Sequence, residues 1–241
     1  MKLNIPRINI PGPVKSLLKL GISLAIIALI LRKIDERQLL EVVREANLLW
    51  VAWAMCWFIL SKIISAFRFN LLLATEDIEM TSRQNLKLYW LCMYYNLLLP
   101  GGISGDGYKI KVLMERFSKP LKRIVTITLI DRISGLIALG QLSVILLFWI
   151  PQIKQYWYFI VPAFFLSLVV GWFIFKWAGG TLSTVWMKTS FQSLGVQGSQ
   201  AIATLGLVIA LGQGMHWADY LILFLISSLV AMVPITIGGA G

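Results

Sequence analysis

The amino-acid sequence predicts an all-α fold: a polytopic helical membrane bundle of about six spans plus a re-entrant element, with Pro/Gly-broken segments in two halves. Of the 241 residues, 58% are hydrophobic and only 14% are charged, and the mean hydropathy is +0.79. Soluble domains carry about 25% charged residues. The apolar residues also form runs close to the roughly 20 residues that a helix needs to cross a bilayer. We therefore expect a single membrane domain covering residues 1–241.

Residues 1–16 are basic and are expected to lie on the cytoplasmic side of the membrane. Basic residues before an apolar run are also typical of a signal peptide. Three prolines interrupt this segment, however, and Arg32-Lys33 follows the apolar run where the small residues of a cleavage site would be expected. The pattern therefore favours an uncleaved first membrane helix.

Six apolar runs are interpreted as membrane spans, of which the first and the fifth are short. They are Leu17–Leu31, Leu48–Ile64, Ile124–Ile150, Trp157–Trp177, Ala201–Met215 and Tyr220–Ile237. Between the first two, residues 32–47 alternate acidic and basic side chains with leucine and valine, which predicts a short amphipathic helix on the membrane surface. Tryptophans and tyrosines near the ends of several runs are typical of interfacial anchors.

A seventh apolar stretch, Leu86–Ser104, differs from the others because polar residues and a Pro-Gly-Gly break lie within it. If this stretch crossed the membrane, the most basic connection, residues 105–123, would lie outside. If it enters and returns to the same side, most lysines and arginines of the loops are cytoplasmic. The positive-inside rule therefore favours a re-entrant element.

The end of the chain contains a sequence similar to this break. Residues 99–105 (LPGGISG) and 233–241 (VPITIGGAG) both combine an apolar run, a proline and glycines. Paired interruptions in two halves of a membrane protein point to a transporter-type binding site. The chain stops in the middle of the second motif, which suggests a truncated C-terminal end. The residues expected to break the helices are Pro100, Gly101, Gly102, Gly105, Pro234, Gly238 and Gly239.

Charged residues inside apolar segments mark the candidate site. A charge near the bilayer centre costs at least ~2.5 kcal/mol, so Asp131 and Arg132 should face protein or water rather than lipid. Together with Arg68, Asp106 and Lys109 they predict a polar cavity for a lipid headgroup. Arg132 is the candidate phosphate clamp, because a guanidinium binds phosphate through two parallel hydrogen bonds.

Other roles for these five residues remain open at this point. Asp131 is expected to pair with Arg132, or with Arg68 or Lys109 from another element, because neighbouring residues on a helix point about 100° apart. Asp131 and Arg132 are alternatively part of a structural ion-pair network. Asp106 is alternatively a helix cap, and Lys109 an ordinary cytoplasmic charge.

Several classes of function lack support in the sequence. The net charge of +11 is explained by membrane topology and attraction to anionic headgroups, and no basic polar domain is present to bind nucleic acid. With one histidine and no nucleotide-binding loop, we expect no metal, no cofactor and no enzymatic activity. A membrane-embedded transferase that uses Asp106 or Asp131 as a base remains an alternative.

Four motifs in order resemble the transmembrane region of the lysylphosphatidylglycerol synthase family, a flippase-like membrane family, over residues 15–241. They are Arg68, Asn96–Gly102 with Gly105–Lys109, Asp131–Leu136, and Pro234–Gly241. Two features depart from the family pattern. Lys109 stands where the family usually has an arginine, and the glycine-rich ending stops before the family's Arg-Glu pair.

The resemblance implies the lipid-translocating part of the family without its soluble aminoacyltransferase domain. The implied location is the cytoplasmic (inner) membrane, and the implied partners are membrane lipids, either anionic or aminoacylated phospholipid or glycolipid. An accessory subunit for lipid or envelope biogenesis, with no transport of its own, is the alternative.

Overall fold

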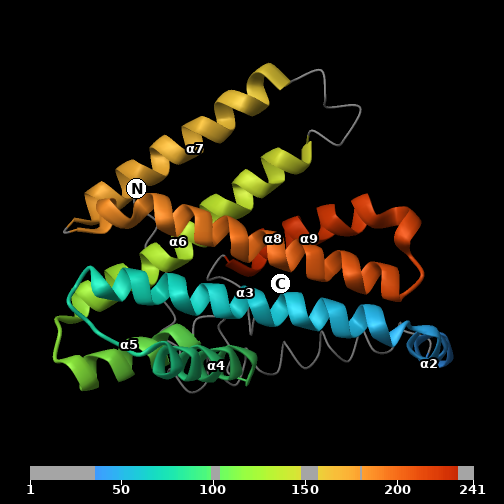
Figure 1. Cartoon of the computed structure of the whole chain (residues 1–241), viewed down its shortest axis with the longest axis horizontal. Coiled ribbons are helices and arrows are strands. Elements are labelled where there is room, and N and C mark those ends of the chain that lie inside the picture. Colours follow the sequence, from blue (N-terminus) through green and yellow to red (C-terminus); the bar gives the residue numbers. More distant parts are fainter. Residues whose placement is uncertain (1–35, 99–103, 148–156, 180, 233–241) are drawn as a thin grey trace, which may run out of the picture.

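The computed structural model describes residues 36–98, 104–147, 157–179 and 181–232, and these residues form helices joined by short connections (Figure 1). Within these ranges there is no β-strand, so the predicted all-α fold is confirmed. The helices are α2 (Glu36–Glu45), α3 (Leu48–Ala74), α4 (Ser82–Leu98), α5 (Ser104–Phe117), α6 (Leu121–Leu147), α7 (Trp157–Ala178), η2 (Leu182–Val185), α8 (Trp186–Ala210), η3 (Gly214–His216) and α9 (Trp217–Met232).

Four helical segments are long and apolar enough to cross a membrane, and α9 is a shorter apolar helix. The four are Leu48–Ala74, Leu121–Leu146, Trp157–Ala178 and Leu182–Ala210. The first three of these segments contain the predicted second, third and fourth spans, as far as those spans lie within the described residues. The predicted first span lies outside the described residues, and α9 corresponds to the start of the sixth.

The predicted fifth span, Ala201–Met215, is wrong in its boundaries. The helix in this region is α8, which begins at Trp186 and ends at Ala210, where Gly212 adopts a positive φ of 71°. The N-terminal half of α8 falls outside the predicted span, because Thr189, Ser193 and other polar residues lower the local hydropathy. These side chains are buried against neighbouring helices rather than exposed to lipid, so they do not prevent a span. The predicted second span also ends too early, since α3 continues to Ala74.

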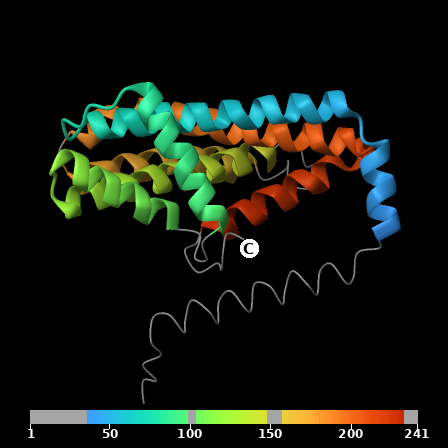
Figure 2. The same ribbon diagram turned by 90° about the horizontal axis from the view of Figure 1, so that it is seen from below.

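Helices α3 and α8 lie side by side along most of their length and form the centre of the bundle (Figures 1 and 2). Gly206 of α8 allows this close approach, because an added Cβ would lie 2.8 Å from the Trp53 ring of α3. Helix α6 packs against α8, and α7 packs against α6. Small residues at helix contacts are typical of membrane bundles, where backbones approach closely.

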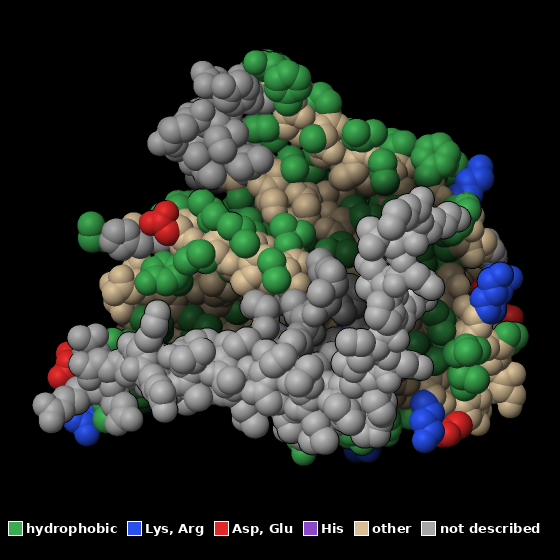
Figure 3. All heavy atoms as spheres, turned by 180° about the vertical axis from the view of Figure 1, so that it is seen from behind, with side chains coloured by type: hydrophobic (Ala, Val, Ile, Leu, Met, Phe, Trp, Pro, Cys, Tyr) green, Lys and Arg blue, Asp and Glu red, His purple; other side chains and the backbone are tan. Residues whose placement is uncertain are grey.

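One end of the bundle contains the main apolar core, which joins α3 to α8 and the helices between them. Its fully buried members include Phe69, Leu72, Leu113, Ile124 and Phe175. Outside this core, many large hydrophobic side chains are exposed on the described surface. In Figure 3 hydrophobic side chains cover much of the described face, and charged side chains lie near its margins. On α7, for example, Phe159 and Phe173 are more than half exposed. Such a surface suits contact with lipid chains.

The contact between Gly171 of α7 and Trp186 of α8 generates a stability prediction. An added Cβ on Gly171 would lie 2.1 Å from the Trp186 ring, which is itself buried. We expect Gly171→Ala to destabilise the protein by about 1–3 kcal/mol, because overpacking forces the ring to move. The measurement is the thermal unfolding midpoint in detergent.

Gly198→Ala is the matched control, because nothing lies within 4 Å of an added Cβ at this helical position. Helix propensity alone favours alanine over glycine by about 1 kcal/mol, so this variant should be as stable as the wild type or more so. A Gly171→Ala midpoint equal to that of Gly198→Ala would contradict the packing argument.

Candidate functional site

The site lies where the helix pair α4–α5 meets the bundle. Helix α4 runs across α3 rather than along it, and α5 packs against α4 (Figure 2). Neither helix is long and apolar enough to be a candidate span. A re-entrant element needs two short helices that enter the membrane and return to the same side. That α4 and α5 form such an element stays a prediction.

Gly105 holds the two helices of this pair together. Its backbone N–H donates a hydrogen bond to Oδ1 of Asn96, at 2.8 Å, and an added Cβ would lie 2.1 Å from the carbonyl oxygen of Cys92. Gly105, one of the predicted break residues, is the second residue of α5, where it permits close packing against α4. The other six expected break residues, Pro100, Gly101, Gly102, Pro234, Gly238 and Gly239, lie outside the described residues.

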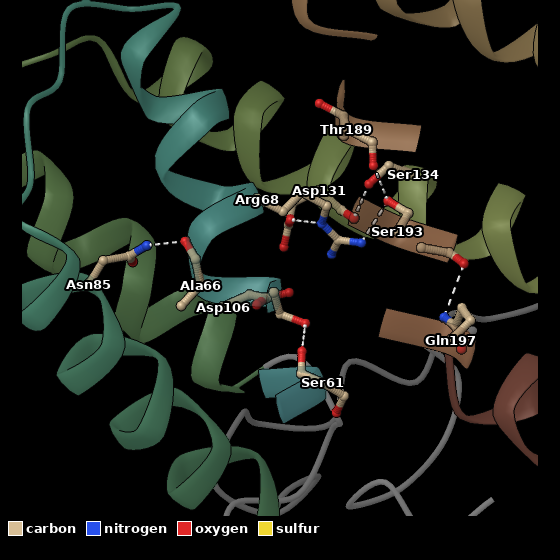
Figure 4. Close-up of polar contacts among 12 residues, drawn as sticks. Ser61, Ala66, Arg68, Asn85, Asp106, Asp131, Ser134, Thr189, Ser193 and Gln197 are labelled. Carbon is tan, nitrogen blue, oxygen red and sulfur yellow. Dashed lines mark hydrogen bonds and ion pairs between the residues drawn. The ribbon is translucent and has the colours of Figure 1, made fainter. Parts of the chain in front are cut away.

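Arg68 connects three helices through its guanidinium group (Figure 4). Its Nε donates a hydrogen bond to Oδ1 of Asp131 on α6, and one terminal nitrogen donates to Oγ of Ser193 on α8, both at 2.9 Å. Ser193 in turn donates to the backbone carbonyl of Thr189. Arg68 and Asp131 are 5% and 4% exposed. Of the partners considered for Asp131, the structure therefore selects Arg68, while Arg132 points elsewhere.

Arg132 pairs with Asp106 of α5 instead. Its Nε donates to Oδ2 of Asp106, and Nζ of Lys109 lies 3.9 Å from the other carboxylate oxygen. Asp106 lies in the first turn of α5, where the helix dipole stabilises a negative charge. Asp106 therefore lies inside the helix and is not a cap before it. Its carboxylate pairs with the side chains of both Arg132 and Lys109.

Lys109 is buried, with 3% of its surface exposed, so the interpretation as an ordinary cytoplasmic charge is wrong. Its ammonium group lies 4.1 Å from the centre of the Phe69 ring and 4.5 Å from that of Tyr89. A cation over an aromatic face is attracted by the electrons of the ring. The lysine is thus stabilised by two rings and by Asp106.

These groups surround one cavity of about 210 Å³, and the five charged residues predicted from the sequence all line it. Four cations face two carboxylates here, so the lining has an excess of positive charge. The lining consists of Lys62, Arg68, Tyr89, Cys92, Met93, Asn96, Asp106, Lys109, Asp131 and Arg132. The neighbouring Tyr94 and Tyr95 are not part of this lining. Tyr94 is largely exposed, and the ring centres of Tyr95 and Tyr108 lie 4.5 Å apart.

The sequence reasoning did not assign Lys62 and Ser193 to the site. Lys62 lies within the α3 span, and its ammonium is 4.6 Å from the Phe58 ring; the described residues give it no carboxylate within ion-pair distance. A lysine inside an apolar span is itself a signal of a polar cavity. Ser193 carries no such signal, because a single serine in a membrane helix is common.

Polar groups continue beyond the cavity along α8. Thr189, Ser193 and Gln197 recur at every fourth position, so they share one face of the helix. All three are buried, and Nε2 of Gln197 donates to the backbone carbonyl of Gly135 on α6. The hydroxyl of Thr189 and Oε1 of Gln197 have no hydrogen-bond partner among the described residues. A buried polar stripe therefore extends from the cavity between α6 and α8.

Fold and site together define a polytopic helical membrane protein with a charged cavity between its helices. Comparison with protein families makes the assignment specific: the chain belongs to the family described as the lysylphosphatidylglycerol synthase TM region, whose model matches residues 16–183. The predicted family is thus confirmed. Every charged residue of the cavity lies inside the matched range, whereas the polar stripe of α8 lies beyond it. Neither curated proteins nor solved structures gave a match.

The buried pair of Arg68 and Asp131 generates the second prediction. Arg68→Met leaves the Asp131 carboxylate without its cation, and removing one partner of a buried ion pair typically costs about 3–5 kcal/mol. We expect a corresponding fall in the free energy of unfolding, measured by denaturant titration in detergent micelles. The double variant Arg68→Met/Asp131→Leu should recover much of this loss, because no unpaired charge remains.

The control is Lys111→Gln, which breaks the pair with Glu115 on the exposed face of α5, where both side chains are more than 60% exposed. An exposed pair contributes about 0–1 kcal/mol, so little change is expected. Equal effects of Arg68→Met and Lys111→Gln would show that the buried pair is not a structural support.

Proposed function

We propose that this protein moves or handles a polar lipid between the two leaflets of the cytoplasmic (inner) membrane. The observation that supports this function is a charged cavity inside a bundle of apolar helices. A lipid crosses a bilayer slowly because its headgroup must enter hydrocarbon, where polar groups lose their hydrogen bonds to water. A protein lowers that barrier when it offers fixed charges and donors to the headgroup and leaves the acyl chains in the bilayer.

The excess of cations in the cavity favours an anionic headgroup, and phosphate is the anion that all phospholipids share. Arg68 is already engaged by Asp131 and Ser193, so its role is to support the site. Arg132 is the better ligand, since 25% of its side chain is exposed. We propose that a phosphate exchanges with the Asp106 carboxylate at this guanidinium, with Lys62 as a second cation.

The polar stripe of α8 is the proposed continuation of the headgroup path. Thr189 and Gln197 are eight positions apart, which corresponds to about 12 Å along a helix axis. Their oxygens without partners are available to a headgroup or to water. A headgroup or a water molecule that entered between α6 and α8 would give these buried oxygens the hydrogen bonds that they lack.

An accessory membrane subunit is the second candidate, and one observation favours it. The contacts of Arg68 tie α3, α6 and α8 together without needing a ligand, as a purely structural network would. The two functions differ in what Arg132 does, because only transport requires its guanidinium to contact a lipid.

The third prediction concerns Arg132→Gln in the full-length protein, reconstituted in liposomes that contain headgroup-labelled phosphatidylglycerol. Hydrogen bonds to charged groups contribute about 1.5–3 kcal/mol, so the rate of lipid exchange should fall roughly ten- to hundredfold. The rate is measured by loss of outer-leaflet fluorescence after a membrane-impermeant quencher is added. Stability should change little, because Lys109 remains near Asp106 and still compensates its charge.

Arg116→Gln is the matched control, since Arg116 is an exposed residue in the last turn of α5 and lies outside the cavity. It should exchange lipid at the wild-type rate. Rates equal to those of protein-free liposomes for folded wild-type protein would favour the accessory role. A parallel loss of activity and folded protein in Arg132→Gln would place Arg132 in the structural network.

A further inference from the structure

A second cavity, of about 670 Å³, lies between the N-terminal half of α6 and the C-terminal end of α7. It shares no lining residue with the charged cavity. Lys122 and Arg123 lie at one end of it, and Leu129 and Ile133 line it further along α6. Trp177 contributes from α7. We call this space the α6–α7 groove.

The groove changes from cationic to apolar along the axis of a membrane span. Lys122 and Ile133 are eleven positions apart, which corresponds to about 16 Å along α6. One leaflet of a bilayer has a hydrocarbon depth of about 15 Å, half of the roughly 30 Å core. The distance along α6 from the cations to the apolar end is therefore close to the depth of one leaflet.

Trp177 places the cationic end of the groove at the membrane surface. Its side chain is 90% exposed and lies in the last turn of α7. Tryptophan at the end of a span is enriched at the level of the lipid headgroups. Lys122 and Arg123 line the same end, so they lie where phosphates are found.

The electrostatics of this end also favour an anion. Lys122 and Arg123 occupy the first turn of α6, which contains no acidic residue. The positive end of the helix dipole disfavours cations at this position and favours anions. Arg123 lies 3.4 Å from Glu76, whereas Lys122 has no carboxylate within ion-pair distance among the described residues. Among the described residues, Lys122 is therefore a cation beside an apolar groove with no carboxylate paired to it.

We propose that the α6–α7 groove binds one anionic phospholipid, with its phosphate at Lys122 and one acyl chain between α6 and α7. Basic pockets between membrane helices bind anionic lipid headgroups in this way. The site is separate from the charged cavity, and this lipid is held in its leaflet rather than moved across the membrane. Binding of a lipid in this groove does not depend on the proposed transport function.

The test is a lipid titration of the full-length protein in detergent, followed by native mass spectrometry. Phosphatidylglycerol and phosphatidylcholine with the same acyl chains are compared. A juxtamembrane lysine contributes about 1 kcal/mol to the binding of anionic lipid, so Lys122→Gln should weaken binding of the first phosphatidylglycerol about fivefold. Binding of phosphatidylcholine should be weaker in the wild type and unaffected by this substitution.

A second variant tests the apolar part of the groove. Leu129 is 52% exposed, so Leu129→Trp places a larger side chain in the groove without entering the core. It should weaken the binding of both lipids. Lys188→Gln is the control, because Lys188 is an exposed lysine in the first turn of α8 and does not line the groove. This variant should bind phosphatidylglycerol as the wild type does.

Three results would overturn the proposal. Equal losses in Lys122→Gln and Lys188→Gln would show a general surface charge effect. Equal binding of the two lipids by the wild type would exclude recognition of the anion. An unchanged titration for Leu129→Trp would show that another part of the protein covers the groove. Thermal unfolding midpoints measured for each variant ensure that only folded protein is compared.

Discussion

The ion pair between Arg68 and Asp131 is the interaction on which the arrangement of the site depends. Charges inside a membrane bundle are costly unless they are paired and hydrogen-bonded. Arg68 meets this requirement with one carboxylate and one hydroxyl, taken from two other helices. The requirement fixes the relative positions of α3, α6 and α8, because a shift of any of these helices would separate a donor from its acceptor. The centre of the bundle is therefore held by charge as well as by apolar packing.

This pairing determines what the neighbouring residue can do. Consecutive residues of a helix point about 100° apart, so Asp131 and Arg132 cannot both face α3. Since Asp131 is directed at Arg68, Arg132 is directed at α5, where it pairs with Asp106. Asp106 reaches this position because Gly105 lets α5 approach the backbone of α4. The neighbouring Asp131 and Arg132 of the sequence thus belong to two separate ion pairs, one buried and the other partly exposed, and both pairs line the cavity.

The fold class and the five charged residues of the cavity could be predicted from the sequence, because charge inside an apolar segment is a strong physical signal. Their pairing could not, because it depends on helix rotation and on which helices are neighbours. The N-terminal half of α8 was missed for a related reason: its polar side chains resemble a solvated segment until the helices that bury them are known. Glycine in such a motif predicts a chain break, but the close approach of Gly105 to the backbone of Cys92 on α4 could not be predicted, because it depends on the packing of two helices.

The charged cavity and the α6–α7 groove both combine basic side chains with apolar helices, at different depths. In the central cavity, the carboxylates compensate only part of the positive charge contributed by four basic residues. In the α6–α7 groove, Glu76 engages Arg123 and leaves Lys122 at the positive end of a helix dipole. Basic residues at these positions attract anions, and the abundant anions of a membrane are lipid phosphates. Depth separates the two proposed roles: a phosphate bound at the surface would keep its lipid in place, whereas a phosphate bound in the bundle interior would already have left the headgroup layer.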